Sequence, residues 1–414
     1  MKLLANIFRI IVGAVFIFSG FAKGVDPLGS TYKFIDYFNA FGMSWLDFTA
    51  LFGSFFMSLL EFLVGVCLFL NIKIRTASWG ALIFMLFFTP LTLILAIKNP
   101  VTDCGCFGDA WILTNWETFW KNVILLAMIL VIFNKRKNFK SIFNFLEQTV
   151  IVVFTAVLMF SLEVHCYRHL PVVDFRPYSV GKDIQAGMTA PEGAPVDEYK
   201  ITLTYKNKTT GETQDFDETN YPWQDTVNWE FHSSSQKLVS EGYKTPIHDF
   251  VIEHPVSGDI TEDILTDDNY TFFVVSYNLE KANNKYWDDL NKLAHLAQEK
   301  NYNFYGLTAS NRDEIKKVTD KYSLPFEFCS TDEIQLKTIV RSNPGLVLMK
   351  KGVVIGKWGH RDLPKPEELQ NGELLSYTIN NMRSDNERYI IYIFILSYFA
   401  LLFAYMIRKY SKIR

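Results

Sequence analysis

Two cysteines separated by one residue stand in the string TDCGCFGD at positions 102–109. This spacing brings the sulfurs of Cys104 and Cys106 within reach of each other, and Gly105 relieves the backbone strain of so small a ring. Strained disulfides have the more oxidising potentials that are typical of catalytic bridges. The pair therefore predicts thiol–disulfide chemistry, and Lys121 is expected to stabilise a thiolate there if it lies close.

The same residues leave two other interpretations open. One thiol of the pair would instead be locked to Cys166 as a structural bridge, or the thiols would bind a metal together with Cys166, His165 and His169. Metal binding is poorly supported, because the histidines lie far along the chain and the paired Cys-x-x-Cys spacing of zinc sites is absent. We predict no metal, and we assign Cys166 to the catalytic set as a third thiol that relays electrons.

Six apolar stretches are long enough, or nearly so, to cross a bilayer as helices. They cover residues 3–22, 48–72, 77–97, 117–133, 145–164 and 389–407, and the first is expected to be retained rather than cleaved as a signal peptide. Basic residues follow the second, fourth and last stretches, so the positive-inside rule places both termini in the cytoplasm. The loops at 23–47 and 98–116, the second of which holds the Cys-Gly-Cys motif, and the polar block 165–388 are then expected on the periplasmic side of the inner membrane, where disulfides persist.

The polar block has an α/β pattern, with a first strand expected at 199–205. A second pattern begins at about residue 248: strands are expected at 271–277 and 302–308, helices at 285–299 and 311–322 with Ser310 as the N-cap, and a strand pair at 342–358. This order, with Pro344 opening the second-last strand, resembles the thioredoxin fold, in which that proline is cis. The Cys-x-x-Cys of thioredoxins is missing, since Tyr277 to Lys281 stand in its place. Cys329 is the only thiol of this domain and is interpreted as a half-buried cysteine at a strand end, with a role as an exchange partner for another cysteine left open.

The membrane half also resembles a known family. The string IVGAVFIFSGFAKGVDPLGS, Glu61 and the TDCGCFGD loop are similar to the DoxX-like superfamily and, within it, to the MauE (methylamine utilisation) type of four-helix membrane protein. The resemblance covers about residues 1–140, and the whole chain looks like a Bacteroidetes-type fusion of that protein to a thioredoxin-like domain. It implies that Cys104 and Cys106 are a redox pair that serves the maturation of an envelope protein, with a quinone as the electron sink. No methylamine substrate follows from the family name.

Glu61 is an ionisable side chain in the middle of an apolar stretch, where a charge is costly and its default interpretation is functional or paired. It would accept a proton when a quinone is reduced, or bond to a group such as Lys23, or pair within the bundle to fix helix packing. Lys23 and Asp26 are expected to position a turn, because Asp-Pro is a turn-initiating dipeptide.

The predicted fold class is a multi-pass α-helical membrane bundle plus an α/β thioredoxin-like periplasmic domain. The expected divisions are a four-helix membrane domain at 1–140, a fifth span at 145–164, a juxtamembrane and β-rich region at 165–247, the thioredoxin-like domain at 248–385 and a last span at 389–407. The predicted function is a possible enzyme activity, thiol–disulfide oxidoreduction on an envelope partner. The alternative is a non-catalytic assembly protein whose disulfides are structural. With a net charge of -3 the chain has no basic surplus, so membrane lipid and an envelope protein are expected partners and nucleic acid is not.

Overall fold

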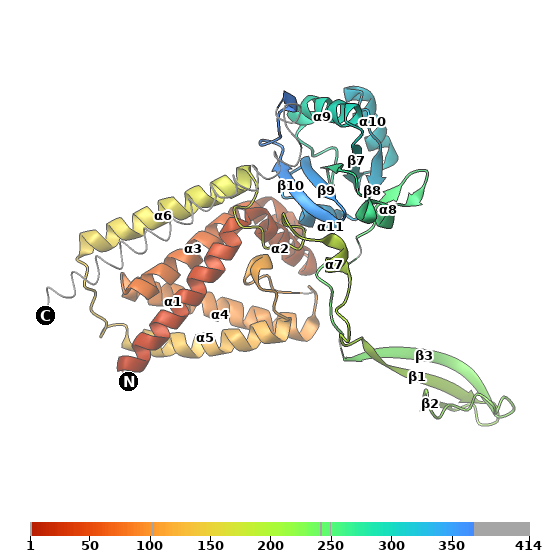
Figure 1. Ribbon diagram of the computed structural model, residues 1–414. Helices are drawn as coiled ribbons and strands as arrows, with labels where there is room; N and C mark the ends of the chain where they lie inside the picture. The colour runs from red at the N-terminus through yellow and green to blue at the C-terminus, as the bar shows by residue number, and fades with distance from the viewer. Residues whose placement is uncertain (1, 102, 241, 249, 368–414) are drawn as a thin grey trace. The chain divides into compact units, whose positions relative to one another are not determined.

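The computed structural model describes residues 2–101, 103–240, 242–248 and 250–367 (Figure 1). The chain divides into two compact units: residues 182–250 form one, and residues 1–181 together with the chain from residue 251 onward form the other. The predicted span at 389–407 lies outside the described residues.

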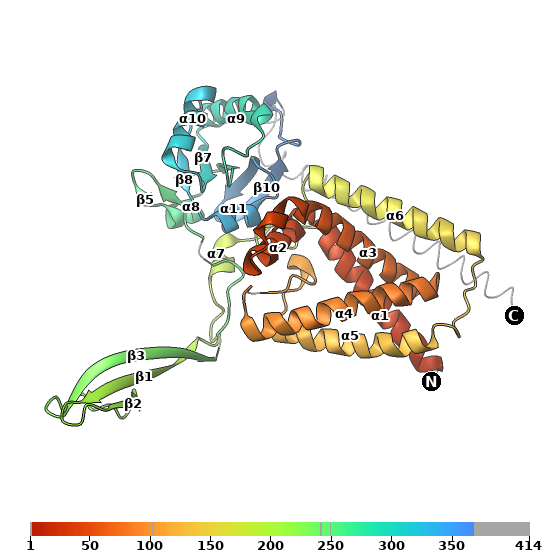
Figure 2. The ribbon, with the colours of Figure 1, turned by 180° about the vertical axis from the view of Figure 1, so that it is seen from behind.

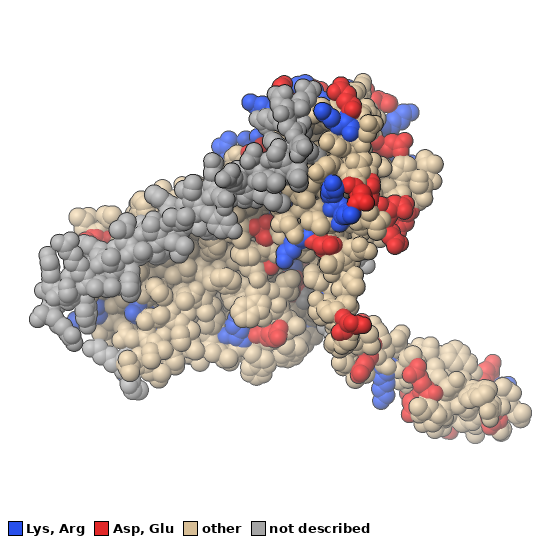
Figure 3. All heavy atoms as spheres, viewed as in Figure 1, with Lys and Arg blue, Asp and Glu red and all other residues tan. Residues whose placement is uncertain are grey.

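Long apolar helices make up the first part of the larger unit (Figures 1 and 2). They are α1 (Lys2–Val25), α3 (Ala50–Leu70), α4 (Ile74–Lys98), α5 (Asn115–Lys135) and α6 (Phe145–Arg168). Within the described residues, five helices have the length and hydropathy to cross a bilayer. Figure 3 shows that the visible surface of these helices carries few charged side chains, as a lipid-facing surface requires. The chain is a multi-pass membrane protein, and the first five predicted spans are confirmed.

Local signals in the sequence explain where these helices begin and end. Capping boxes open two of them, Thr114 with Glu117 at α5 and Asn144 with Glu147 at α6. Helix α3 ends at Asn71, which adopts the left-handed conformation that closes a helix. The amide of Asn71 donates to the carbonyl oxygen of Lys140 at 2.9 Å, which joins the loop after α3 to the loop after α5.

Small residues allow α1 and α3 to approach closely, as in many membrane helix pairs. A Cβ atom added to Gly65 would lie 2.6 Å from the backbone nitrogen of Ile17, and one added to Gly20 would lie 2.6 Å from that of Phe62. Gly65→Ala is expected to lower the free energy of unfolding by about 1–3 kcal/mol, because neither backbone can move aside. The free energy of unfolding is measured in a detergent titration. Gly53→Ala on the same helix is the control, since its nearest neighbour is 3.6 Å away, and equal stability of both variants would contradict the prediction.

The segment 23–47 was expected to be a loop and is instead largely helical. It contains α2 (Pro27–Ala40) and a 3-10 turn, η1 (Ser44–Thr49). Asp26 caps α2 by accepting from the backbone N–H of Gly29 at 2.9 Å, and Pro27 occupies the first turn. The prediction of a turn at Asp-Pro was wrong because the same dipeptide is a start signal when a helix follows: aspartate caps, and proline needs no N–H partner there.

The second part of the larger unit is a seven-stranded sheet with the order β10-β9-β6-β7-β8-β4-β5. Its strands are β4 (Glu253–His254), β5 (Gly258–Asp259), β6 (Thr271–Val275), β7 (Asn303–Thr308), β8 (Phe328–Ser330), β9 (Gly345–Lys350) and β10 (Val353–Gly359). Strand β6 pairs parallel with β7 and antiparallel with β9. All five of its residues are buried, as expected of a central strand.

Helices flank this sheet, and the sequence predicted the two longest. They are α8 (Thr261–Thr266), η3 (Asn284–Tyr286), α9 (Trp287–Glu299), α10 (Arg312–Tyr322) and α11 (Glu333–Ile339). The N-cap of α10 is Asn311, not Ser310, because the Asn311 side chain accepts from the N–H of Glu314. Cys329 lies in β8 and is fully buried, so the half-buried strand-end interpretation was wrong. The Asn343–Pro344 peptide bond is cis, as predicted.

The smaller unit contains a short helix, α7 (Ile184–Met188), and an antiparallel sheet of order β2-β1-β3. Its strands are β1 (Glu198–Asn207), β2 (Thr213–Asp217) and β3 (Trp229–Ser240). The predicted strand at 199–205 is confirmed. Gly211, with φ +75°, completes the turn between β1 and β2, a conformation that glycine adopts without strain.

Candidate functional site

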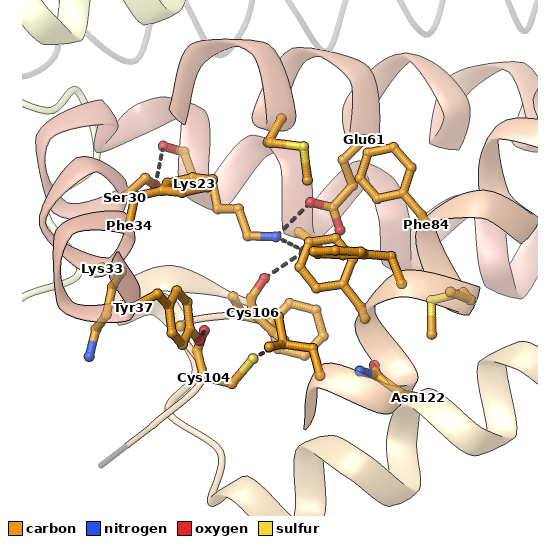
Figure 4. A pocket seen from close by; sticks show the side chains of 18 of the residues that line it. Lys23, Ser30, Lys33, Phe34, Tyr37, Glu61, Phe84, Cys104, Cys106 and Asn122 are labelled. Atoms are coloured by element: carbon orange, nitrogen blue, oxygen red, sulfur yellow. Dashed lines mark hydrogen bonds and ion pairs between the residues drawn. The ribbon is translucent and has the colours of Figure 1, made fainter. Parts of the chain in front are cut away.

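A cavity of about 220 Å³ lies between α1, α2, α3, α4, α5 and the loop that follows α4 (Figure 4). Most of its lining is apolar and aromatic, including Phe34, Phe84 and Phe88. A few polar groups face it, namely Ser19, Lys23, Tyr37, Glu61, Lys121 and Asn122. An apolar pocket with few placed polar groups is typical of sites for small organic molecules. A cavity of roughly 150 Å³ already accepts benzene, so this one has room for a substituted ring.

The two cysteines of the Cys-Gly-Cys loop line this cavity together (Figure 4). Their sulfur atoms are 3.0 Å apart. Gly105 between them has φ +63°, which allows the chain to reverse within two residues. The N–H of Gly105 donates to Asp103 Oδ1 at 2.9 Å, which stabilises the turn. The geometry is that of a pair able to close into a disulfide.

Side chains from two helices hold the backbone of this loop. The Tyr37 hydroxyl donates to the carbonyl oxygen of Cys104 at 2.5 Å, and the Ser19 hydroxyl donates to that of Cys106 at 2.6 Å. Lys33 Nζ is 2.7 Å from Asp103 Oδ2. Lys33 and Tyr37 are one turn apart on α2, so this helix, which the sequence pattern did not predict, supplies two of these contacts.

The two thiols differ in acidity. The pKa of Cys106 is lowered to about 6, chiefly by the hydrogen bond from the Cys104 thiol and further by the charges of Lys121 and Lys23, against the effect of burial. The same hydrogen bond, together with burial, raises the pKa of Cys104. Lys121 Nζ lies 4.2 Å from the centre of the Phe107 ring, which holds the ammonium beside the loop. At neutral pH the arrangement favours a Cys106 thiolate beside a protonated Cys104.

An ion pair lies in the wall of the cavity next to the thiols. Lys23 Nζ lies 2.6 Å from Glu61 Oε2 and donates to the Ser19 hydroxyl at 3.0 Å (Figure 4). Glu61 is thus bonded to Lys23, as one of its interpretations expected, and its roles as a proton acceptor and in helix packing stay predictions. Lys23 lies in the last turn of α1, not in an exit loop, and its charge faces the thiols rather than a turn.

Breaking this ion pair on one side should destabilise the protein. Glu61→Gln leaves the Lys23 ammonium poorly compensated inside the bundle, so we expect a loss of about 3 kcal/mol in the free energy of unfolding. The double variant Lys23→Met with Glu61→Leu removes both charges and should recover most of that loss. Unfolding in a detergent titration separates the cases. A Glu61→Gln protein as stable as the parent would contradict the prediction.

The remaining predicted site residues lie elsewhere. Cys166 is buried in α6 and is not among the residues that line the cavity, so its relay role stays a prediction. The rings of His165 and His169 stack with centroids 4.8 Å apart. Within the described residues, no group of histidine, cysteine and carboxylate side chains is placed to hold a metal ion. Pro344 lies in the loop before β9, where its carbonyl oxygen accepts from the Ser342 hydroxyl at 2.6 Å.

Comparisons with known proteins cover parts of the chain. Residues 199–241 match a domain of unknown function, DUF8463. A crystal structure of an uncharacterized conserved protein from Geobacillus kaustophilus is similar at 16% identity and a TM-score of 0.23, over 30% of this chain and 70% of that one. No curated protein matches the chain. Residues 1–134, which include the whole cavity, match the family described as methylamine utilisation protein MauE.

Proposed function

We propose that this protein is a membrane thiol–disulfide oxidoreductase whose reacting pair is Cys104 and Cys106. The observation that carries the proposal is the pair itself: two sulfurs 3.0 Å apart, of unequal acidity, on the wall of an apolar cavity. A thiolate is the reactive form in disulfide exchange, and a lowered pKa makes a sulfur both available at neutral pH and a good leaving group.

In the oxidised protein the difference in acidity directs the exchange. A thiolate of the partner attacks Cys104 Sγ, the Cys104–Cys106 bond breaks, and the electron pair leaves on Cys106, the more acidic sulfur. The second thiolate of the partner then attacks the partner sulfur of the mixed disulfide. Cys104 departs and takes a proton, so the partner gains a disulfide and this protein holds two electrons as a dithiol.

A quinone fits the cavity and would supply the two-electron acceptor that returns the pair to a disulfide. The aromatic lining would contact a flat ring, and Cys106 already faces the space. Glu61 and Lys23 lie on the same wall, where the Lys23 ammonium can donate a hydrogen bond into the cavity and Glu61 Oε2 can hold a proton released from the dithiol. Both roles are inferred from the positions of Lys23 and Glu61 in the cavity wall.

The same proposal includes the membrane topology, the family relationship, the fold of the α/β region and the substrate. The basic residues after the second and fourth spans support a cytoplasmic location of those loops, with the Cys-Gly-Cys loop and the α/β region on the periplasmic side of the inner membrane. The MauE match covers the part of the chain whose sequence resembles the DoxX-like superfamily, and kinship with redox proteins of that superfamily is part of the proposal. The strand order β10-β9-β6-β7, the parallel β6–β7 pair and the cis Pro344 support a thioredoxin-like domain. An envelope protein dithiol would be the substrate.

Oxidation of a simple dithiol tests the proposal without knowledge of the partner. The full-length protein in lipid nanodiscs is supplied with dithiothreitol and a short-chain benzoquinone, and quinone reduction is followed by absorbance. Catalytic reduction well above that of empty nanodiscs is expected. A rate equal to the empty control, with Cys104 and Cys106 remaining dithiols, would favour the alternative of a non-catalytic assembly protein, which the missing Cys-x-x-Cys at 277–281 also favours.

A further inference from the structure

Arg341 of the α/β region is bonded to two carboxylates of the membrane half. Its side chain is only 6% exposed. Nε lies 2.9 Å from Asp26 Oδ2, and Nη2 lies 2.8 Å from the same oxygen and 3.1 Å from Asp109 Oδ2. Nη1 donates to the carbonyl oxygen of Lys337 at 2.5 Å. Every guanidinium nitrogen thus has a partner, as a buried charge requires.

The two carboxylates belong to the elements that build the redox site. Asp26 caps α2, and Asp109 lies in the short turn η2 (Gly108–Ala110), three residues after Cys106. Burial alone would raise the pKa of Asp26, but the charge of Arg341 reverses this and lowers it. Burial raises the pKa of Asp109 although Arg341 opposes the shift. Asp26 makes the more extensive contact, since it bonds to Nε and Nη2, whereas Asp109 bonds to Nη2 alone at 3.1 Å.

Arg341 also opens the loop that contains the cis proline. Within this loop the Asn343 side chain accepts from the Ser276 hydroxyl at 2.6 Å and donates to the carbonyl oxygen of Asn278 at 2.8 Å. The loop is thereby fixed to the segment after β6, where thioredoxins carry their cysteines. Tyr277 in that segment is hydrogen-bonded to Tyr32 of α2.

The same helix continues the connection to the thiols. Lys337 Nζ lies 4.9 Å from the centre of the Tyr32 ring, so a cation–π contact adds to the hydrogen bond. Further along α2, Lys33, the next residue, holds Asp103, and Tyr37, five residues on, holds the carbonyl of Cys104. The α/β region thus contacts the Cys-Gly-Cys loop directly through Asp109 and indirectly through α2.

We infer that the α/β region acts on its own chain, and that Arg341 is a positioning residue which clamps the Cys-Gly-Cys loop and α2 around the cavity. In this inference the face of the α/β region that carries the cis proline is covered by α2 of the same chain and not by a separate protein. The consequence for catalysis rests on the proposed function, because the clamp sets how far the pair is exposed to a dithiol. A domain that holds the loop in place needs no cysteines of its own, which accounts for the residues at 277–281.

Alkylation of Cys106 tests the clamp independently of any oxidase activity. The reduced full-length protein in nanodiscs is treated with iodoacetamide from pH 5 to 9, and modification of each cysteine is quantified by mass spectrometry. Arg341→Gln is expected to raise the plateau rate at Cys106 about tenfold, because loss of charge-assisted hydrogen bonds shifts the loop toward open states. The pH at which Cys106 alkylation is half-maximal should also rise, because Cys106 in an open loop lies farther from the charges of Lys121 and Lys23.

Three further variants complete the experiment. Asp109→Asn removes the same contact from the loop side without altering the α/β region, and the double variant with Arg341→Gln should add nothing if the two residues act as one contact. Lys351→Gln, which breaks an exposed ion pair with Asp268, is the matched control and should behave as wild type. Wild-type rates and midpoints in both Arg341→Gln and Asp109→Asn would overturn the inference. A wild-type protein that protects Cys106 from iodoacetamide but does not reduce quinone would overturn the proposed function instead.

Discussion

Replacing Cys106 with serine is expected to reduce dithiol-dependent quinone reduction to background, a loss on the order of 100-fold or more. Without Cys106 no disulfide can form in the loop, and the sulfur with the lowered pKa is gone. Cys104→Ser should have the same effect on turnover, because the other half of the bridge is missing. The assay is the nanodisc measurement with dithiothreitol and a benzoquinone.

The control is a cysteine that the cavity does not contain. Cys329 is fully buried in β8 and does not line the cavity, so Cys329→Ala should retain the wild-type rate. Cys166→Ser addresses the predicted relay: an unchanged rate would remove Cys166 from the catalytic set, and a loss comparable with that of Cys106→Ser would keep it there. Wild-type turnover in either Cys104→Ser or Cys106→Ser, with the protein folded, would contradict the proposed reaction.

The second large effect concerns the reactivity of Cys106 against pH. In wild type, alkylation should follow the thiolate fraction with a midpoint near the pKa of about 6: slow below it, and at its plateau by neutral pH. Cys104→Ala removes the hydrogen bond that contributes most to this lowered pKa, so the midpoint should rise toward or above the ordinary value of about 8.5. At pH 7 the rate would then fall by about tenfold or more, since few molecules carry the thiolate.

A smaller upward shift is expected from Lys121→Met, because the charge of Lys121 ranks below the Cys104 hydrogen bond among the causes that lower the pKa. Lys135→Met provides the matched control: it removes an equal charge from the last turn of the same helix, α5, and should leave the midpoint unchanged. A wild-type midpoint near 8.5 would show that the thiolate is not stabilised. A Cys104→Ala profile identical to wild type would show that the neighbouring thiol is not the cause.

The sequence predicted the features that depend on local pattern. Five spans follow from runs of apolar residues, and the central strands follow from buried β-branched and aromatic stretches such as 271–275. These spans and strands need only residues that are neighbours in the chain. The cis bond at Pro344 was instead predicted from the resemblance to the thioredoxin fold, because proline makes cis bonds common but does not say which X-Pro bond is cis.

The site itself required contacts that no local pattern encodes. Helix α2 was taken for a loop, since Asp26-Pro27 is compatible with a turn and with a helix start. The bond of Arg341 to Asp26 joins positions 315 residues apart, and its existence depends on how the α/β region docks. The i to i+4 spacing of Lys33 and Tyr37 was a usable signal, because it puts a cation and a hydroxyl on one face of α2.

The most direct measurement is the redox state of Cys104 and Cys106 in the membrane. Membranes are quenched in acid before and after a brief pulse of reductant, and again after addition of a quinone, and free thiols are tagged with a heavy maleimide. The account predicts that these two cysteines gain two tags within minutes of the pulse and lose both when quinone is added. A pair that takes no tag after the pulse, or that keeps its tags in the presence of quinone, would contradict a redox role for the Cys-Gly-Cys loop.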